Sequence, residues 1–155
     1  MKNKKENIIG KILVLVILVS AAGCTQQDRV SVLEDFVSVL ETSKDFQDYS
    51  SDFKETFNKE FDPEIEKAIV LEDSTAVAER KAEMENSTAT SGYASIYENL
   101  PDKKLHEVWI FDKQHSNRGV VAILNMENRN VLNFVATIRV ELNGEFELNN
   151  EDDSQ

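Results

Sequence analysis

The chain is poor in the residues that most small exported domains and many enzymes depend on. Its single cysteine cannot form an internal disulfide bond. Its five glycines are scattered, so no glycine-rich loop is available to hold a phosphate. The longest apolar run, Ile12–Val19, has eight residues, well short of the about 20 that a membrane-spanning helix needs. These absences exclude a disulfide framework, a phosphate-binding loop and a transmembrane anchor.

Basic residues are also scarce, with 17 Lys and Arg against 29 Asp and Glu. This excess of acidic residues argues against nucleic acid as a partner, because affinity for nucleic acid comes largely from Lys and Arg on phosphates. It argues equally against adhesion to anionic lipid headgroups, which would repel a negatively charged surface.

The first 23 residues have the parts of a secretory signal. Lys2, Lys4 and Lys5 form a positive start, Ile12–Val19 form an apolar centre, and the small residues Ser20–Gly23 lead to a cleavage point. Beyond residue 24 the chain becomes polar at once, which does not suit an anchor that stays in the bilayer. We therefore predict that residues 1–23 are a signal peptide that is removed.

The sequence Ala21-Ala22-Gly23-Cys24 resembles the lipobox of bacterial lipoproteins. In that family the cysteine receives a diacylglyceryl thioether, and the signal is then cut in front of it. The resemblance covers residues 1–24 only and departs at Ala21, where the family most often has Leu. It implies that Cys24 is the lipidation site and that lipid anchors the protein on the exported face of the cell membrane. A lone free thiol would be unusual in an oxidising compartment, whereas a lipid-capped one is not.

Cleavage before Cys24 would leave 132 residues, with 13 basic and 28 acidic side chains and a formal charge of −15. That length suits one domain. We predict a lipidated N-terminus and short tether over 24–28, a single domain over 29–148, and a disordered acidic tail over 149–155. The charge predicts that the domain stands away from the membrane surface while the lipid holds it nearby.

Helical periodicity dominates the first half of this domain. Apolar residues recur at helical spacing over Asp28–Thr42, and Asp45–Phe61 carries an aromatic stripe that we interpret as a core-facing helix surface. Pro63 fits the first position of a third helix capped by Asp62. Asp73-Ser74 predicts a further cap before Thr75–Glu85, which is rich in good helix formers. Whether one long helix or two short ones cover 63–85 stays open. Tyr93–Leu100 predicts one or two more helical turns before Pro101.

After Pro101 the apolar period changes to 2. The strand candidates are Leu105–Asp112, Val120–Met126, Val131–Leu142 and Glu145–Leu148. Val120–Leu124 is apolar throughout, as in a central strand covered on both faces. In Val131–Leu142 the alternation predicts one buried face and one mostly wet face.

A hairpin is predicted around Asn143-Gly144. A three-residue loop, Leu142-Asn143-Gly144, would pair Val140 with Phe146 on one face, so we expect that loop, with Gly144 at positive φ in a bulge.

Little in the sequence indicates chemistry. His106 and His115 are the only histidines, and with Asp102, Glu107 and Asp112 they could be imagined as a metal or acid–base site. The spacing is not that of a metal site and no cysteine adds a ligand, so we interpret both as solvent-exposed histidines and predict neither metal nor cofactor. Ser91-Gly92 lacks the context of a serine nucleophile, and the acidic run 150–153 lacks the glycine and spacing of a calcium loop.

The predicted fold class is α+β, with three or four N-terminal helices packed on one face of a C-terminal four-stranded antiparallel meander. This order resembles the architecture of NTF2-like and cystatin-like domains, an analogy without a shared motif. With no assembled catalytic set, we expect a non-catalytic interaction or accessory module of the cell envelope, and enzymatic activity stays open. The partner would be another envelope protein. The alternative is a small-molecule-binding or hydrolytic NTF2-like domain with a helix-roofed pocket lined by Phe53, Phe57, Tyr93, Tyr97 and Trp109.

Overall fold

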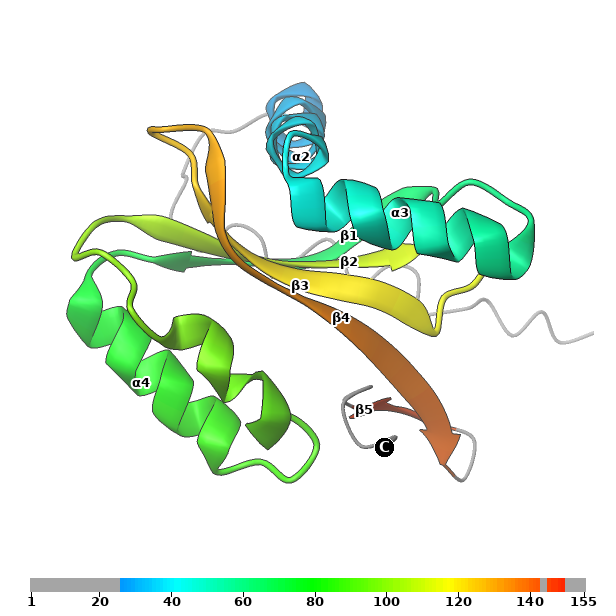
Figure 1. Cartoon of the computed structure of the whole chain (residues 1–155). Coiled ribbons are helices and arrows are strands. Elements are labelled where there is room, and N and C mark those ends of the chain that lie inside the picture. Colours follow the sequence, from blue (N-terminus) through cyan, green and yellow to red (C-terminus); the bar gives the residue numbers. More distant parts are fainter. Residues whose placement is uncertain (1–25, 143–144, 150–155) are drawn as a thin grey trace, which may run out of the picture.

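The computed structural model describes residues 26–142 and 145–149. It has two successive helices, a strand, a third helix with a short 3₁₀ helix after it, and four further strands (Figure 1). In chain order these are α2 (Gln26–Glu41), α3 (Lys44–Phe57), β1 (Pro63–Leu71), α4 (Ser74–Glu85), η1 (Ser91–Tyr97), β2 (Leu105–Asp112), β3 (Arg118–Asn125), β4 (Asn130–Leu142) and β5 (Glu145–Asn149). The predicted α+β class is confirmed. No helix in these two ranges is long and apolar enough to cross a membrane.

The sheet is an antiparallel meander of five strands in the order β1-β2-β3-β4-β5. The four predicted C-terminal strands all form, but the third predicted helix is wrong, because residues 63–71 form β1. Its β-branched residues Ile65, Ile69 and Val70 suit a strand, and the edge of β2 supplies the backbone hydrogen bonds. Pro63 begins this edge strand instead of a helix, a position where its missing N–H costs nothing.

Helices cover both faces of the sheet, so the predicted one-sided arrangement is wrong. Figure 1 shows α2 and α3 on one side and α4 with η1 on the other. Two separate apolar cores result, one under α2 and α3 and one under α4 and η1. Every residue of Val120–Leu124 in β3 is fully buried, which confirms the prediction of a central strand covered on both faces.

The second face of β4 is covered as well, which corrects the expectation of a wet face. Thr137 is 1% exposed and its hydroxyl lies 2.6 Å from that of Tyr93. The pairing of β4 with β3 shifts at Leu132, which places Leu132 in one core and Phe134 in the other. A bulge of this kind reverses the alternation, so a period-2 reading of the whole strand assigns Leu132 to the wrong face.

The β4–β5 hairpin has the register Leu142↔Glu145 and Glu141↔Phe146. The connection is therefore two residues long, and the predicted pairing of Val140 with Phe146 is wrong. Asn-Gly favours a two-residue turn, and that preference outweighs the sorting of side chains by face at the edge of the sheet. The predicted φ of Gly144 falls outside the described residues, as do the signal segment, Cys24 and residues 150–155.

The helices predicted over Asp28–Thr42, Asp45–Phe61 and Thr75–Glu85 are present as α2, α3 and α4, with altered ends. The α3 helix buries Phe46 and Phe53 as the aromatic stripe predicted, but it ends at Phe57, because Asn58 takes a left-handed conformation with φ 52°. Phe61 packs edge-on against Phe46 and Phe53 from the following loop. At α4 the carboxylate of Asp73 accepts hydrogen bonds from two backbone N–H groups of the first turn, as expected of a cap.

Candidate functional site

A pocket of about 430 Å³ lies between α4 and the sheet, and we call it the Lys67 pocket. A β-bulge in β1 shapes it: Ile65 pairs with Ile110 and Lys67 pairs with Trp109, so Glu66 has no partner in the ladder. A bulge re-aims side chains where it interrupts pairing, and here two consecutive residues, Glu66 and Lys67, both line the pocket. The remaining lining residues are Arg80, Glu83, Met84, Ser87, Thr90, Trp109 and Arg139.

A buried carboxylate, Glu107 of β2, supports one wall of this pocket. Arg80 donates to both of its oxygens, from Nε and from Nη2, each at 2.8 Å. The Tyr97 hydroxyl donates to Oε2 at 2.6 Å, and the Trp109 indole N–H donates to Oε1. Burial acts to raise the pKa of Glu107, but the hydrogen bonds and charge of Arg80, with the Trp109 and Tyr97 donors, outweigh it and lower the pKa.

The Glu107 cluster, formed by Glu107, Arg80, Tyr97 and Trp109, holds groups in place instead of exchanging protons. The hydrogen bond to Glu107 raises the pKa of Arg80, and burial raises the pKa of the Tyr97 hydroxyl. At neutral pH Glu107 is therefore ionised, Arg80 is charged and the Tyr97 hydroxyl is protonated. The free side of the guanidinium donates from Nη1 to Glu83 at 2.9 Å. The cluster thus fixes Arg80 in the pocket wall with bidentate geometry.

Two further cations line the Lys67 pocket. The guanidinium of Arg139 lies over the ring of Phe111, 3.6 Å from its centroid, and forms an ion pair with Glu66. Burial lowers the pKa of Arg139 to about 10. Burial, and then the charge of Arg80, lower the pKa of Lys67. Among the described residues, no hydrogen bond or ion pair reaches the Lys67 ammonium.

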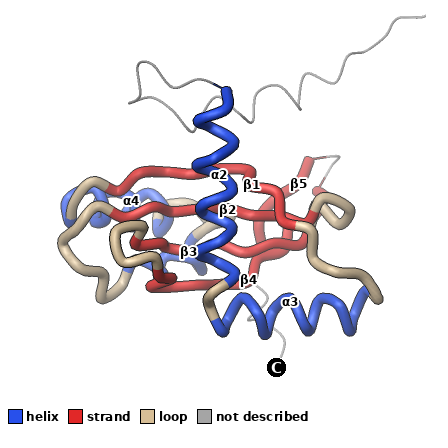
Figure 2. The backbone as a smooth tube through the Cα atoms, turned by 90° about the horizontal axis from the view of Figure 1, so that it is seen from above, coloured by secondary structure: helices blue, strands red, loops and turns tan. Residues whose placement is uncertain are grey.

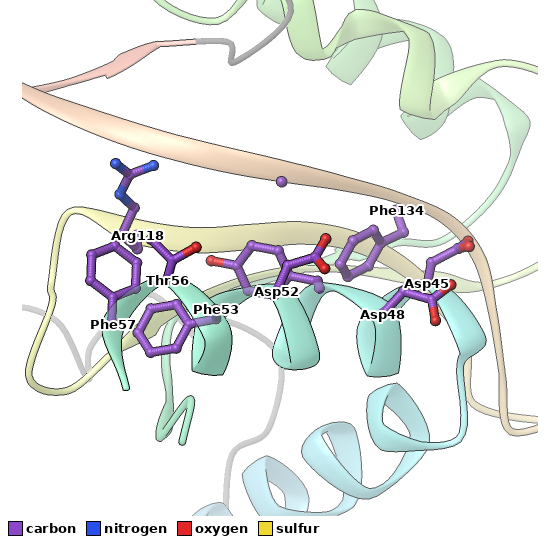
Figure 3. Close-up of a pocket in the computed structure, with 10 residues that line it drawn as sticks. Asp45, Asp48, Asp52, Phe53, Thr56, Phe57, Arg118 and Phe134 are labelled. Atoms are coloured by element: carbon purple, nitrogen blue, oxygen red, sulfur yellow. The ribbon is translucent and has the colours of Figure 1, made fainter. Parts of the chain in front are cut away.

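A second pocket, of about 460 Å³, lies on the other face between α3 and strands β3 and β4, and we call it the α3 groove. Asp45, Asp48 and Asp52 recur at helical spacing along α3, so they share one face of the helix. Figure 3 shows Asp45 and Asp48 at one end of the groove and Arg118, with Phe57, at the other. Its remaining lining residues are Tyr49, Phe53, Thr56, Phe134 and Ala136. Aromatic rings beside carboxylates form a surface suited to organic cations.

The five residues of the imagined metal or acid–base site are not brought together. Only Asp112 and His115 meet, with the carboxylate 3.3 Å from Nδ1, and Asp112 also accepts three backbone N–H groups of the surrounding loops. Glu107 belongs to the cluster described above, and Asp102 accepts from the backbone N–H of Ser74. The His106 ring packs at a tilt against Phe36, with the two ring centroids 5.1 Å apart. In the described ranges no group of three or more His, Cys, Asp or Glu could hold a metal ion.

The expectation of solvent-exposed histidines is also wrong. Both rings are half-buried against aromatic side chains: His106 packs on Phe36, and His115 packs on Phe53 and Phe57. Burial lowers the pKa of His106, which favours its neutral form.

The predicted helix-roofed aromatic pocket is divided by the sheet. Phe53 and Phe57 pack in the core under α2 and α3, whereas Tyr93, Tyr97 and Trp109 pack in the core under α4 and η1. Each part adjoins its own pocket, since Phe53 and Phe57 line the α3 groove and Trp109 lines the Lys67 pocket.

Sequence reasoning did not identify Glu66, Lys67, Arg80 or Arg139 as site residues. One signal was available: Glu107 stands between apolar residues in a strand, and a charge buried there requires a partner. Its partner Arg80 lies in a helix 27 residues earlier, and no local pattern indicates that distance.

No protein-family model, curated protein or solved structure matches this chain.

Proposed function

We propose that this protein is a lipid-anchored domain of the bacterial cell envelope that acts by binding and is not a catalyst. The anchor would be lipid on Cys24, on the exported face of the cell membrane, and the partner would be another envelope protein. The signal-like residues 1–23 and the lipobox-like residues before Cys24 support the anchor. At least two acyl chains would be needed for stable attachment.

The observation that carries the binding role is the state of the Glu107 cluster. Its carboxylate uses both oxygens on four donors and is fully buried, so it is not available as a general base. The hydroxyl of Thr90 in the adjoining Lys67 pocket donates to the carbonyl of Met84 at 3.2 Å. Neither histidine lines this pocket. The absence of a nucleophile paired with a base among the residues that line this pocket supports a binding role over a catalytic one.

The shape of α2 is compatible with attachment close to the membrane. This helix begins at Gln26, two residues after Cys24, and its first apolar residue that packs on the core is Leu33. Figure 2 shows α2 lying across the strands with its N-terminal end extending past β1. The seven residues before Leu33 rise by about 10 Å at 1.5 Å per residue. As a helical stalk they would keep an acidic domain beyond the screening length of about 8 Å from a charged surface.

The anchor is tested by Cys24→Ala. We expect the unchanged protein in the membrane fraction, where it incorporates a labelled fatty acid. The variant should be unlabelled and should appear as soluble or unprocessed protein, because the acceptor thiol is gone. Unchanged fractionation and labelling of the variant would refute the lipid anchor.

The partner is tested by crosslinking in intact membranes followed by purification of the lipidated protein. The Cys24→Ala variant is the matched control, because it has the same domain in a different location. The proposal expects one envelope protein to be captured by the anchored form in stoichiometric amounts. Turnover of a substrate by the purified protein, with no such partner, would contradict it.

A second candidate function is small-molecule binding. It is favoured by the Lys67 pocket, whose volume of about 430 Å³ falls in the range of roughly 300–1,000 Å³ typical of ligand sites. In this alternative the anchored domain would hold a bound small molecule at the membrane. It could do so in place of binding an envelope protein or in addition to it.

A further inference from the structure

We propose that the Lys67 pocket binds a small organic monoanion, a carboxylate with a short apolar group, and that the Lys67 ammonium is its main contact. This inference goes beyond the anchored binding role and does not depend on the lipid. It rests on how charge is distributed among the side chains that line the pocket, on its apolar wall, and on its volume.

Lys67 is the pocket cation that lacks a partner. Arg80 is held by Glu107 and Glu83, and Arg139 is held by Glu66 and the ring of Phe111. The ammonium of Lys67 is half-buried next to Arg80, and it makes no hydrogen bond or ion pair with a described residue. A partly desolvated charge without a partner is unfavourable. A bound anion would supply the missing partner through a charge-assisted hydrogen bond.

The acidic residues around Lys67 limit the charge of the ligand. Glu66 and Glu83 line the same pocket, and Glu107 lies behind Arg80. A carboxylate places one negative charge against one unpaired cation. A phosphate or a dicarboxylate would bring a second negative charge toward these three carboxylates and be repelled by them. The pocket is therefore suited to monoanions.

The rest of the pocket wall defines the remainder of the ligand. Met84 and Trp109 are buried core residues that reach the pocket, and Ser87 and Thr90 add small polar side chains from the connection between α4 and η1. An alkyl or aryl group of a few carbons would contact Met84 and Trp109 while its carboxylate reaches Lys67. Removal of that apolar group from water would favour binding.

Trp109 makes this site directly observable, since it is the only tryptophan in the chain and lines the pocket. The full-length protein in non-ionic detergent is titrated with sodium butyrate while the indole fluorescence is followed. Sodium chloride at the same ionic strength is the reference, and inorganic phosphate is the comparison anion. We expect a saturable change with butyrate, and with phosphate no change beyond that of chloride.

The variant Lys67→Met should weaken butyrate binding at least tenfold, whereas Lys67→Arg should retain it because the charge remains. Lys103→Met is the matched control: Lys103 is an exposed lysine paired with Glu127 away from the pocket, and its loss should leave the affinity unchanged. Ser87→Phe should also abolish binding by filling the pocket from its edge. Thermal unfolding of each variant establishes that it is folded.

Three results would overturn the proposal. They are equal butyrate affinity in the unchanged protein and Lys67→Met, a response that follows ionic strength alone, and phosphate binding as tight as butyrate binding. If Lys67→Met does not fold, Ser87→Phe decides, and unchanged binding in that variant overturns the proposal. None of these results affects the Cys24 test, so the lipid anchor and the anion site are tested independently of each other.

Discussion

The two faces of the sheet are built on different physical principles. Under α2 and α3 the core is apolar and rich in aromatic rings, with Phe46, Tyr49, Phe53 and Phe61 in a chain of ring contacts at 5–7 Å. Under α4 and η1 the core surrounds a buried carboxylate and its donors. The first face is stabilised by contacts with little directional preference, and the second by hydrogen bonds with fixed geometry.

This difference determines how far the charged groups of each pocket are exposed to water. Aromatic rings fill the space under α3, so the charged groups of the α3 groove lie at the protein surface. Asp45, Asp48 and Asp52 are exposed to solvent there. On the other face the Glu107 cluster brings Arg80 into the pocket wall beside Lys67, where charge is partly shielded from water. Electrostatic interactions are stronger in such an environment. The polar core therefore places the charges of its pocket in the more shielded of the two environments.

The strongest test of the comparison is Glu107→Ala. Loss of this carboxylate leaves Arg80 without its bidentate partner and leaves the Tyr97 and Trp109 donors unsatisfied, so we expect a loss of about 3–5 kcal/mol in the free energy of unfolding. Urea denaturation followed by circular dichroism measures it. The matched control is Asp35→Ala, which removes an exposed pair with Arg129 and should cost at most about 1 kcal/mol. A similar loss in the free energy of unfolding in both variants would show that the Glu107 cluster stabilises the fold no more than an exposed ion pair does.

The second prediction concerns the same face, under α4 and η1, and its expected effect is of intermediate size: the stabilisation by Glu107 should depend on pH. The pKa of Glu107 is lowered in the folded protein, so its stabilisation is present above the ordinary value of 4.5 and is lost as pH falls through the lower folded pKa. The stability gap between the unchanged protein and Glu107→Gln should therefore narrow below pH 4.5. Denaturation curves across that range measure the gap. A gap that is constant with pH would contradict the assignment of an ionised Glu107.

The smallest effect is expected on the other face, at the α3 groove. Asp52 is exposed and lies one helical turn from Asp48, so Asp52→Asn relieves a like-charge contact and should stabilise the protein by roughly 0.2–0.5 kcal/mol. Thermal unfolding at low salt measures it, and the gain should fade as salt screens the charges. Destabilisation by more than about 1 kcal/mol would show that the acidic side of the groove is structural after all.

The local pattern was sufficient for elements whose neighbours along the chain determine their structure. The aromatic stripe of α3, the Asp73 cap of α4 and the fully apolar Val120–Leu124 each predicted an observed feature. Prediction failed at residues 63–71, where helix and strand patterns are both possible and pairing with β2 decides. It failed again at Leu132, where a bulge that the alternation does not reveal exchanges the two faces.

The sequence by itself determined the α+β class and the acidic charge, which argues against nucleic acid as a partner. It also predicts the export signal and the lipobox-like cysteine. Only the tertiary structure decided that helices cover both faces, and that Lys67, Arg80, Arg139 and Glu107 meet on one of them. The physical reason is the range of the interactions. Periodicity and caps act within a few residues, whereas Arg80 meets Glu107 because α4 packs across strands that are far apart in sequence.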